Sequence, residues 1–108
     1  MEINEYQEKA VSTAIYGEGH KIVYPMLGLC GETGEVAEKI KKVLRDNNGN
    51  FTVDKKVEIA KELGDVMWYV AALARDIGYK LNEITDINLE KLASRRDRGK
   101  IQGNGDNR

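Results

Sequence analysis

Residue types that carry common kinds of enzyme chemistry are scarce in this chain. Its 108 residues include one cysteine and one histidine, and the only serines are Ser12 and Ser94. The single cysteine, Cys30, excludes an internal disulfide and favours a reducing compartment, so we expect a cytoplasmic protein. A Cys/His metal cluster is excluded, and a serine triad would have to use His20, in the Gly-rich stretch YGEGHK. If the chain is an enzyme without an organic cofactor, carboxylates remain to carry the chemistry by holding a hard metal ion.

Long apolar runs and an excess of either charge are also missing. The 17 basic and 18 acidic residues leave a formal net charge of -1, so neither a nucleic acid nor a membrane surface is an expected partner. The start, MEINEYQEKA, is polar and acidic, unlike a signal peptide. Hydrophobic residues make up 41% of the chain, which is typical of a folded protein, and the length suits one small domain.

Apolar periodicity predicts an all-α protein with four helices and no strand. The first helix has Asn4 as its N-cap, the second has Pro25 in its first turn, and the third is followed by Gly78. The stretch DNNGN is a loop. We expect a helical domain over residues 1–98 and a polar, Gly-rich tail over residues 99–108. The predicted helices are 5–16, 25–45, 54–77 and 82–98.

The third predicted helix has a broad apolar stripe that runs from Ile59 to Ile77. Four helices of this length bury only a modest core, and small domains are marginally stable alone. We therefore expect a homodimer or homotetramer that completes the four-helix protomer, with a self-sufficient monomer as the alternative.

Two pairs of carboxylates lie at the edges of the predicted apolar stripes. They follow the spacings E-x-x-E and E-x-x-D, which place each pair on one side of its helix. Four such groups facing one another would repel strongly unless a cation neutralised them, and Mg²⁺ prefers carboxylate, water and phosphate oxygens. The alternative is a pair of ordinary solvated helix faces, on which acidic residues have little energetic effect. The four residues are Glu32, Glu35, Glu62 and Asp65.

Three glycines recur every third residue within the second predicted helix, at Gly28, Gly31 and Gly34. Each destabilises a helix interior by roughly 1 kcal/mol relative to alanine. We interpret them as small residues that make room for a neighbouring helix or a nucleotide.

These residues carry a resemblance to a known family. The stretches LGLCGETGEVAEKIKK and EIAKELGDVMWYVAALARDIG are similar to the MazG-like branch of the all-α nucleoside triphosphate pyrophosphohydrolase superfamily. The two carboxylate pairs match the signature of that family. The stretch NLEKLASRRDRG resembles its downstream N-x-x-K-L-x-x-R element through Asn88, Lys91 and Arg95, and GNGDNR resembles the tail of a compact subset.

The resemblance implies hydrolysis of a nucleoside triphosphate between the α and β phosphates, giving a monophosphate and pyrophosphate. It also implies Mg²⁺ dependence, with Mn²⁺ as a substitute, and removal of non-standard or surplus nucleotides. The four acidic residues are then the metal ligands, and one glutamate, for which Glu35 is our choice, holds the attacking water as general base.

Several further residues are candidates for binding the substrate, by their positions on the predicted helices or by the resemblance. Lys39 would meet a phosphate or form an exposed salt bridge, and Asn88 and Lys91 would reach the triphosphate or make a polar helix face. Gln7 and Trp68 are candidates for contact with the base, with packing as the alternative for Trp68. Arg95 and Arg108, with Lys91, would close over the phosphates as the tail becomes ordered over the nucleotide.

Two other functions stay open at this point. One is a non-catalytic helical module that binds a protein or nucleic acid. The other is phosphoribosyl-ATP pyrophosphatase, which shares the acidic signature. No short motif specifies the base, the sugar, the use of diphosphates, or a bacterial or viral origin.

Overall fold

The computed structural model describes all 108 residues and contains four α-helices, one short 3₁₀ helix and no strand. The predicted all-α class is therefore confirmed. None of the helices combines the length and the apolar character needed to cross a membrane. The elements are α1 (Ile3–Val11), η1 (Glu18–His20), α2 (Val23–Asp46), α3 (Val53–Asp76) and α4 (Leu81–Asp97).

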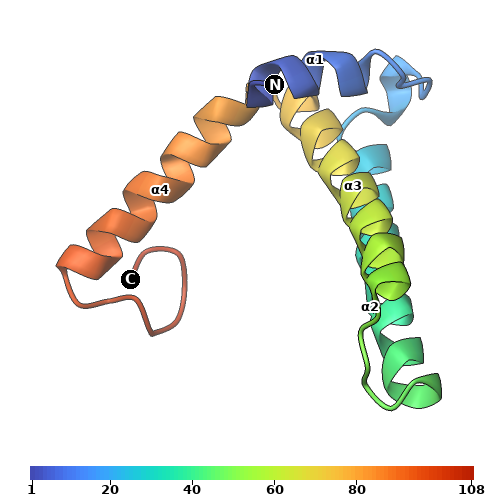
Figure 1. Ribbon diagram of the computed structural model, residues 1–108. Helices are drawn as coiled ribbons and strands as arrows, with labels where there is room; N and C mark the ends of the chain where they lie inside the picture. The colour runs from blue at the N-terminus through green and yellow to red at the C-terminus, as the bar shows by residue number, and fades with distance from the viewer.

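The two longest helices, α2 and α3, form an antiparallel hairpin (Figure 1). Each has 24 residues and is about 36 Å long. Helix α1 crosses one end of this hairpin, and α4 starts at the same end and then diverges from it (Figure 1). The last ten residues fold back beside the end of α4 (Figure 1). The hairpin and α4 are thus separate arms joined at one end.

A short turn connects α2 to α3, as the stretch DNNGN predicts. Asn48 and Gly49 both have positive φ angles, 52° and 74°, which asparagine and glycine tolerate best. The Thr52 hydroxyl then accepts a hydrogen bond of 3.2 Å from the Lys55 backbone N–H. This N-cap explains why α3 begins at Val53, one residue earlier than predicted.

Helix α1 is displaced from its predicted range of 5–16. It begins at Ile3 because Asn4 is not a cap: its side chain accepts from the Asn82 N–H and donates to Asn82 Oδ1. It ends at Val11, where the hydroxyls of Ser12 and Thr13 donate to the carbonyls of Lys9 and Ala10. Such local bonds compete with helix continuation.

The arms are joined around a small core at the α1 end, made of Ala71, Ala74 and Leu81. Buried Gln7 fixes this junction: its amide donates to the carbonyls of Ala71 and Tyr79 and accepts from the Leu81 N–H. The predicted contact of Gln7 with a base is therefore wrong, because its polar atoms are already paired with backbone. Gly78, at φ 89°, ends the α3 region as predicted.

Most of the predicted apolar stripe of α3 is not covered by this chain. Only 8 of 108 residues are buried, while Leu63 and Met67 are 48% and 50% exposed. Val70 and Ile77 are exposed as well. An apolar face of this kind is typical of a surface that another molecule covers. The expected homo-oligomer stays a prediction.

Candidate metal centre

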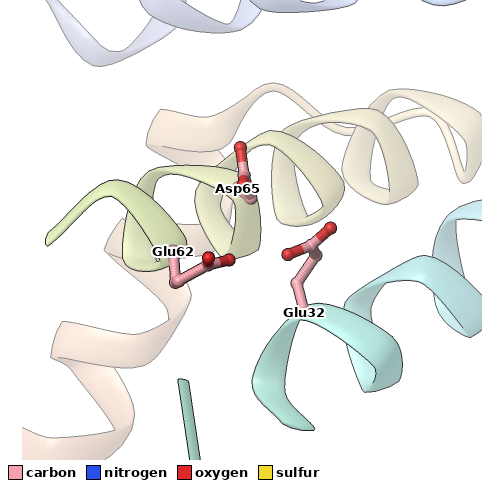
Figure 2. A group of neighbouring side chains, drawn as sticks. All are labelled: Glu32, Glu62 and Asp65. Atoms are coloured by element: carbon pink, nitrogen blue, oxygen red, sulfur yellow. The ribbon is translucent and has the colours of Figure 1, made fainter. Parts of the chain in front are cut away.

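Three of the predicted acidic residues converge between the two long helices (Figure 2). Glu32 comes from α2, and Glu62 and Asp65 come from α3. One carboxylate oxygen of each lies within 4.8 Å of the others. Because residues three apart share a helix face, the E-x-x-D spacing aims both α3 carboxylates at α2. The sequence pattern thus produces a real cluster of oxygen donors.

Glu35, the fourth predicted ligand, does not belong to this cluster. It is exposed on α2, and its negative charge contributes to the raised pKa of Glu32. Of the four acidic residues in the signature, three therefore converge and Glu35 lies outside their cluster.

The electrostatics of the cluster are unfavourable without a cation. Partial burial raises the pKa of Glu32, and the negative charges of Asp65 and Glu62 raise it further. None of the three carboxylates forms an ion pair with a lysine or arginine. Unpaired carboxylate oxygens at this spacing fit a hard divalent ion such as Mg²⁺.

A cavity of about 310 Å³ opens beside the cluster. Glu32, Asp65, Trp68 and Tyr69 line it. The two aromatic rings meet edge to face, with centroids 5.0 Å apart. The Trp68 indole N–H donates to Ala10 O and Thr13 Oγ1, which fixes the ring against α1. An acidic end and an aromatic wall therefore face one space.

Glycine makes this packing possible at one position only. A Cβ at Gly28 would overlap the Tyr69 ring, so only glycine lets α2 approach that side chain. No atom of this chain would touch a Cβ at Gly31 or Gly34. The predicted role of the glycines is confirmed within the chain for Gly28 alone.

Asp76, which is not among the predicted functional residues, ties the start of α2 to the end of α3. Its buried carboxylate accepts hydrogen bonds from the Ile22 N–H, the Tyr16 hydroxyl and the Arg75 guanidinium, at 2.8–3.2 Å. Burial raises the pKa of Asp76, but these hydrogen bonds outweigh that effect and hold the pKa below its ordinary value. No sequence signal marks this contact, since its partners are 54 and 60 residues away.

Four of the five predicted substrate-binding residues lie on the other arm, away from the acidic cluster (Figure 1). Lys39 lies on α2 and is half-buried. Asn88, Lys91 and Arg95 lie on α4, the arm that diverges from the hairpin (Figure 1). Arg108 lies in the segment folded beside it. Within a single chain, Lys91, Arg95 and Arg108 are thus on a different arm from the acidic cluster.

The fold and site define an all-helical protein with a carboxylate centre between two antiparallel helices. Residues 24–99 match the family model of the MazG nucleotide pyrophosphohydrolase domain, so the chain belongs to the MazG family. The chain is 49% identical over 114 residues to the gene 37 protein of Mycobacterium phage L5, an alignment that covers all of both chains. No solved structure matches the chain significantly. The resemblance noted in the sequence is confirmed.

Proposed function

We propose that this protein is a Mg²⁺-dependent nucleoside triphosphate pyrophosphohydrolase that removes non-standard or surplus nucleotides. The observation that supports this most strongly is the convergence of three unpaired carboxylates in a chain of the MazG family. Glu32, Glu62 and Asp65 would hold the metal ion, and Mn²⁺ can replace Mg²⁺. When bound, the ion supplies positive charge that stabilises the phosphate chain during displacement.

Glu35 acts as general base in this proposal. Its carboxylate is exposed and outside the cluster, so it keeps oxygen atoms for a water molecule. It accepts the proton as that water attacks the α phosphorus. The bond from the α phosphorus to the bridging oxygen breaks, and pyrophosphate leaves together with a nucleoside monophosphate.

The cavity beside the cluster suits a nucleobase. Trp68 and Tyr69 offer aromatic surface, and bases of every kind stack on such surfaces. Lys39, on the same helix as Glu32, would contact a phosphate. In this proposal the base lies at the aromatic wall and the phosphates lie at the acidic end.

Asn88, Lys91, Arg95 and Arg108 serve the same substrate only if a second chain contributes them. The divergence of α4 from the hairpin supports this, as does the exposed apolar face of α3. We therefore propose a homodimer or homotetramer in which α4 of one copy approaches the hairpin of another.

The reaction is tested by pyrophosphate release from ribo-, deoxyribo- and modified nucleoside triphosphates, with Mg²⁺ and with EDTA. We expect release of pyrophosphate with an equal amount of monophosphate in Mg²⁺ alone. Glu62→Gln should abolish it, whereas Glu58→Gln, one turn away and outside the cluster, should not.

If folded protein releases no pyrophosphate from any triphosphate of the panel, the proposal is contradicted. The exposed apolar face of the hairpin would then favour the second candidate, a helical interaction module without catalysis. That function predicts partner binding that persists in EDTA.

A further inference from the structure

The last ten residues, 99–108, form a closed loop that we call the C-terminal clasp. Gly99, Gly103 and Gly105 have φ angles of 68°, 145° and 82°, which allow its sharp turns. The Arg108 guanidinium closes the loop by donating to the carbonyls of Lys100, Ile101 and Gly105, at 3.2, 3.0 and 2.7 Å. The clasp is therefore held by specific contacts to its own backbone.

Arg95 of α4 anchors the clasp. The residue is only 6% exposed. Its Nη2 donates to the carbonyl of Asp106 at 2.9 Å and that of Gly105 at 3.5 Å, and it lies 3.4 Å from Asp106 Oδ1. Lys91 Nζ lies 3.1 Å from the same Asp106 oxygen. One carboxylate thus faces two cations.

The Nε atom of Arg95 is buried and has no hydrogen-bond partner. Nε and Nη2 form one edge of a guanidinium, the edge that binds two oxygens of a carboxylate or phosphate in parallel. The Asp106 carboxylate contacts only one of these two donors: its Oδ1 atom lies 3.4 Å from Nη2. Buried donors are seldom left unpaired, so this edge is built for an oxyanion that the clasp supplies only in part.

Asp106 is poorly placed to resist displacement. Its side chain is 83% exposed, and exposed ion pairs are weak. A phosphoryl group has more oxygens and more charge, and it can reach both Nε and Nη2 of Arg95 as well as Lys91.

We propose that the C-terminal clasp is a displaceable latch: a phosphate oxyanion binds Arg95 and Lys91 in place of the Asp106 carboxylate, and its binding releases residues 99–108. The identification of the oxyanion as a phosphoryl group of the nucleotide or of pyrophosphate rests on the proposed function. The basic pair and its unpaired donor do not.

The latch is tested by calorimetric titration of the full chain with inorganic pyrophosphate in EDTA, where no metal-dependent turnover occurs. Asp106→Asn removes the competing charge and should bind pyrophosphate about three- to tenfold more tightly than the wild type. The matched control is Asp86→Asn, an exposed aspartate on α4 outside these contacts, which should change affinity less than twofold. Equal or weaker binding by Asp106→Asn, or no binding by either protein, would overturn the latch.

A second measurement follows the clasp itself. Saturating pyrophosphate should speed hydrogen exchange of the backbone amides of residues 99–106 in the wild type, while those of α3 keep their protection. Arg95→Lys, which lacks the two-donor edge, should lose most of the pyrophosphate affinity with helical circular dichroism retained. Unchanged or slower exchange in the clasp would contradict its release.

The two proposals fail in different ways. Tighter pyrophosphate binding by Asp106→Asn, together with no hydrolysis of any triphosphate, would support the latch and refute the proposed pyrophosphohydrolase activity. Metal-dependent hydrolysis with no effect of Asp106→Asn on pyrophosphate binding would do the reverse.

Discussion

The two arms of the molecule differ in how their main cluster of like charges is paired. On the hairpin, Glu32, Glu62 and Asp65 converge without any basic partner. On the other arm, Lys91 and Arg95 already share the carboxylate of Asp106. One arm therefore lacks a cation, while the other carries its own replaceable anion.

This difference indicates which groups an outside ligand must satisfy. The hairpin leaves its three converging carboxylates without a basic partner and its apolar face uncovered, which is unfavourable unless a metal ion and a second chain cover them. On the α4 arm, Lys91 and Arg95 have a carboxylate partner and one buried donor of Arg95 stays unpaired, although apolar side chains such as Leu89 are exposed there as well. The hairpin is thus the part of the molecule whose completion depends most on binding.

The largest expected effect comes from removing a charge of the acidic cluster. Asp65→Asn should lower kcat/KM for the preferred triphosphate by about 10²–10³-fold, because a neutral amide is a poor ligand for Mg²⁺. Steady-state assays over a range of Mg²⁺ concentrations measure this. Activity within threefold of the wild type, from protein of unchanged helicity, would remove Asp65 from the site.

The apolar side of the hairpin gives the next effect. Met67→Asp places a charge on the exposed stripe of α3, where Met67 is 50% exposed in the single chain. If a second copy covers this stripe, the substitution should weaken association by about 2 kcal/mol or more, which is about thirtyfold or more in the dissociation constant. Sedimentation velocity should show an oligomer for the wild type and monomer for the variant. A monomeric wild type would contradict the proposed assembly.

Two aspartates of α3 sharpen the comparison, since Asp65 is unpaired and Asp76 accepts several hydrogen bonds. Asp76→Asn should lower the free energy of unfolding at pH 7 by about 1–3 kcal/mol. The pKa of Asp76 is depressed in the fold, so its stabilisation is present above the ordinary value near 4 and is lost as pH falls through the folded pKa.

The difference in stability between wild type and Asp76→Asn should therefore shrink below about pH 4. Urea denaturation at pH 7, 5 and 3 measures it. A constant difference at all three values would show that the carboxylate charge is not what stabilises the junction.

The smallest effects come from a matched pair of glycines on α2. Gly28→Ala forces a methyl group into the Tyr69 ring and should destabilise the fold by about 1–3 kcal/mol. Gly31→Ala meets no atom of the chain and should stabilise the helix by about 0.5–1 kcal/mol. Thermal denaturation of both variants checks this. A clear loss of stability from Gly31→Ala would indicate that another molecule packs there.

Much of the fold follows from local sequence signals. Apolar periodicity predicts the two long helices to within two residues at each end, and DNNGN and Gly78 mark their limits. The early end of α1 is harder to predict, because it depends on hydroxyl groups of Ser12 and Thr13 that bond back to the helix.

The site is only partly predictable, because it depends on contacts between residues that are far apart in the sequence. The E-x-x-E and E-x-x-D spacings identify Glu32, Glu62 and Asp65, but which carboxylate stays outside depends on how α2 is rotated against α3. The roles of Asp76 and Asp106 depend on partners that only the folded chain brings close. The direction of α4 likewise depends on the hydrogen bonds of Gln7 at the junction of the two arms, which no sequence motif predicts.

The central claim is that the three converging carboxylates form a divalent metal site. Titration of the protein with Mn²⁺, followed by electron paramagnetic resonance of the free ion, tests this without substrate or turnover. We expect saturable binding by the wild type and by Glu58→Gln, competition by Mg²⁺, and loss of binding in Glu62→Gln. Equal binding by all three proteins, or none by the wild type, would contradict the claim.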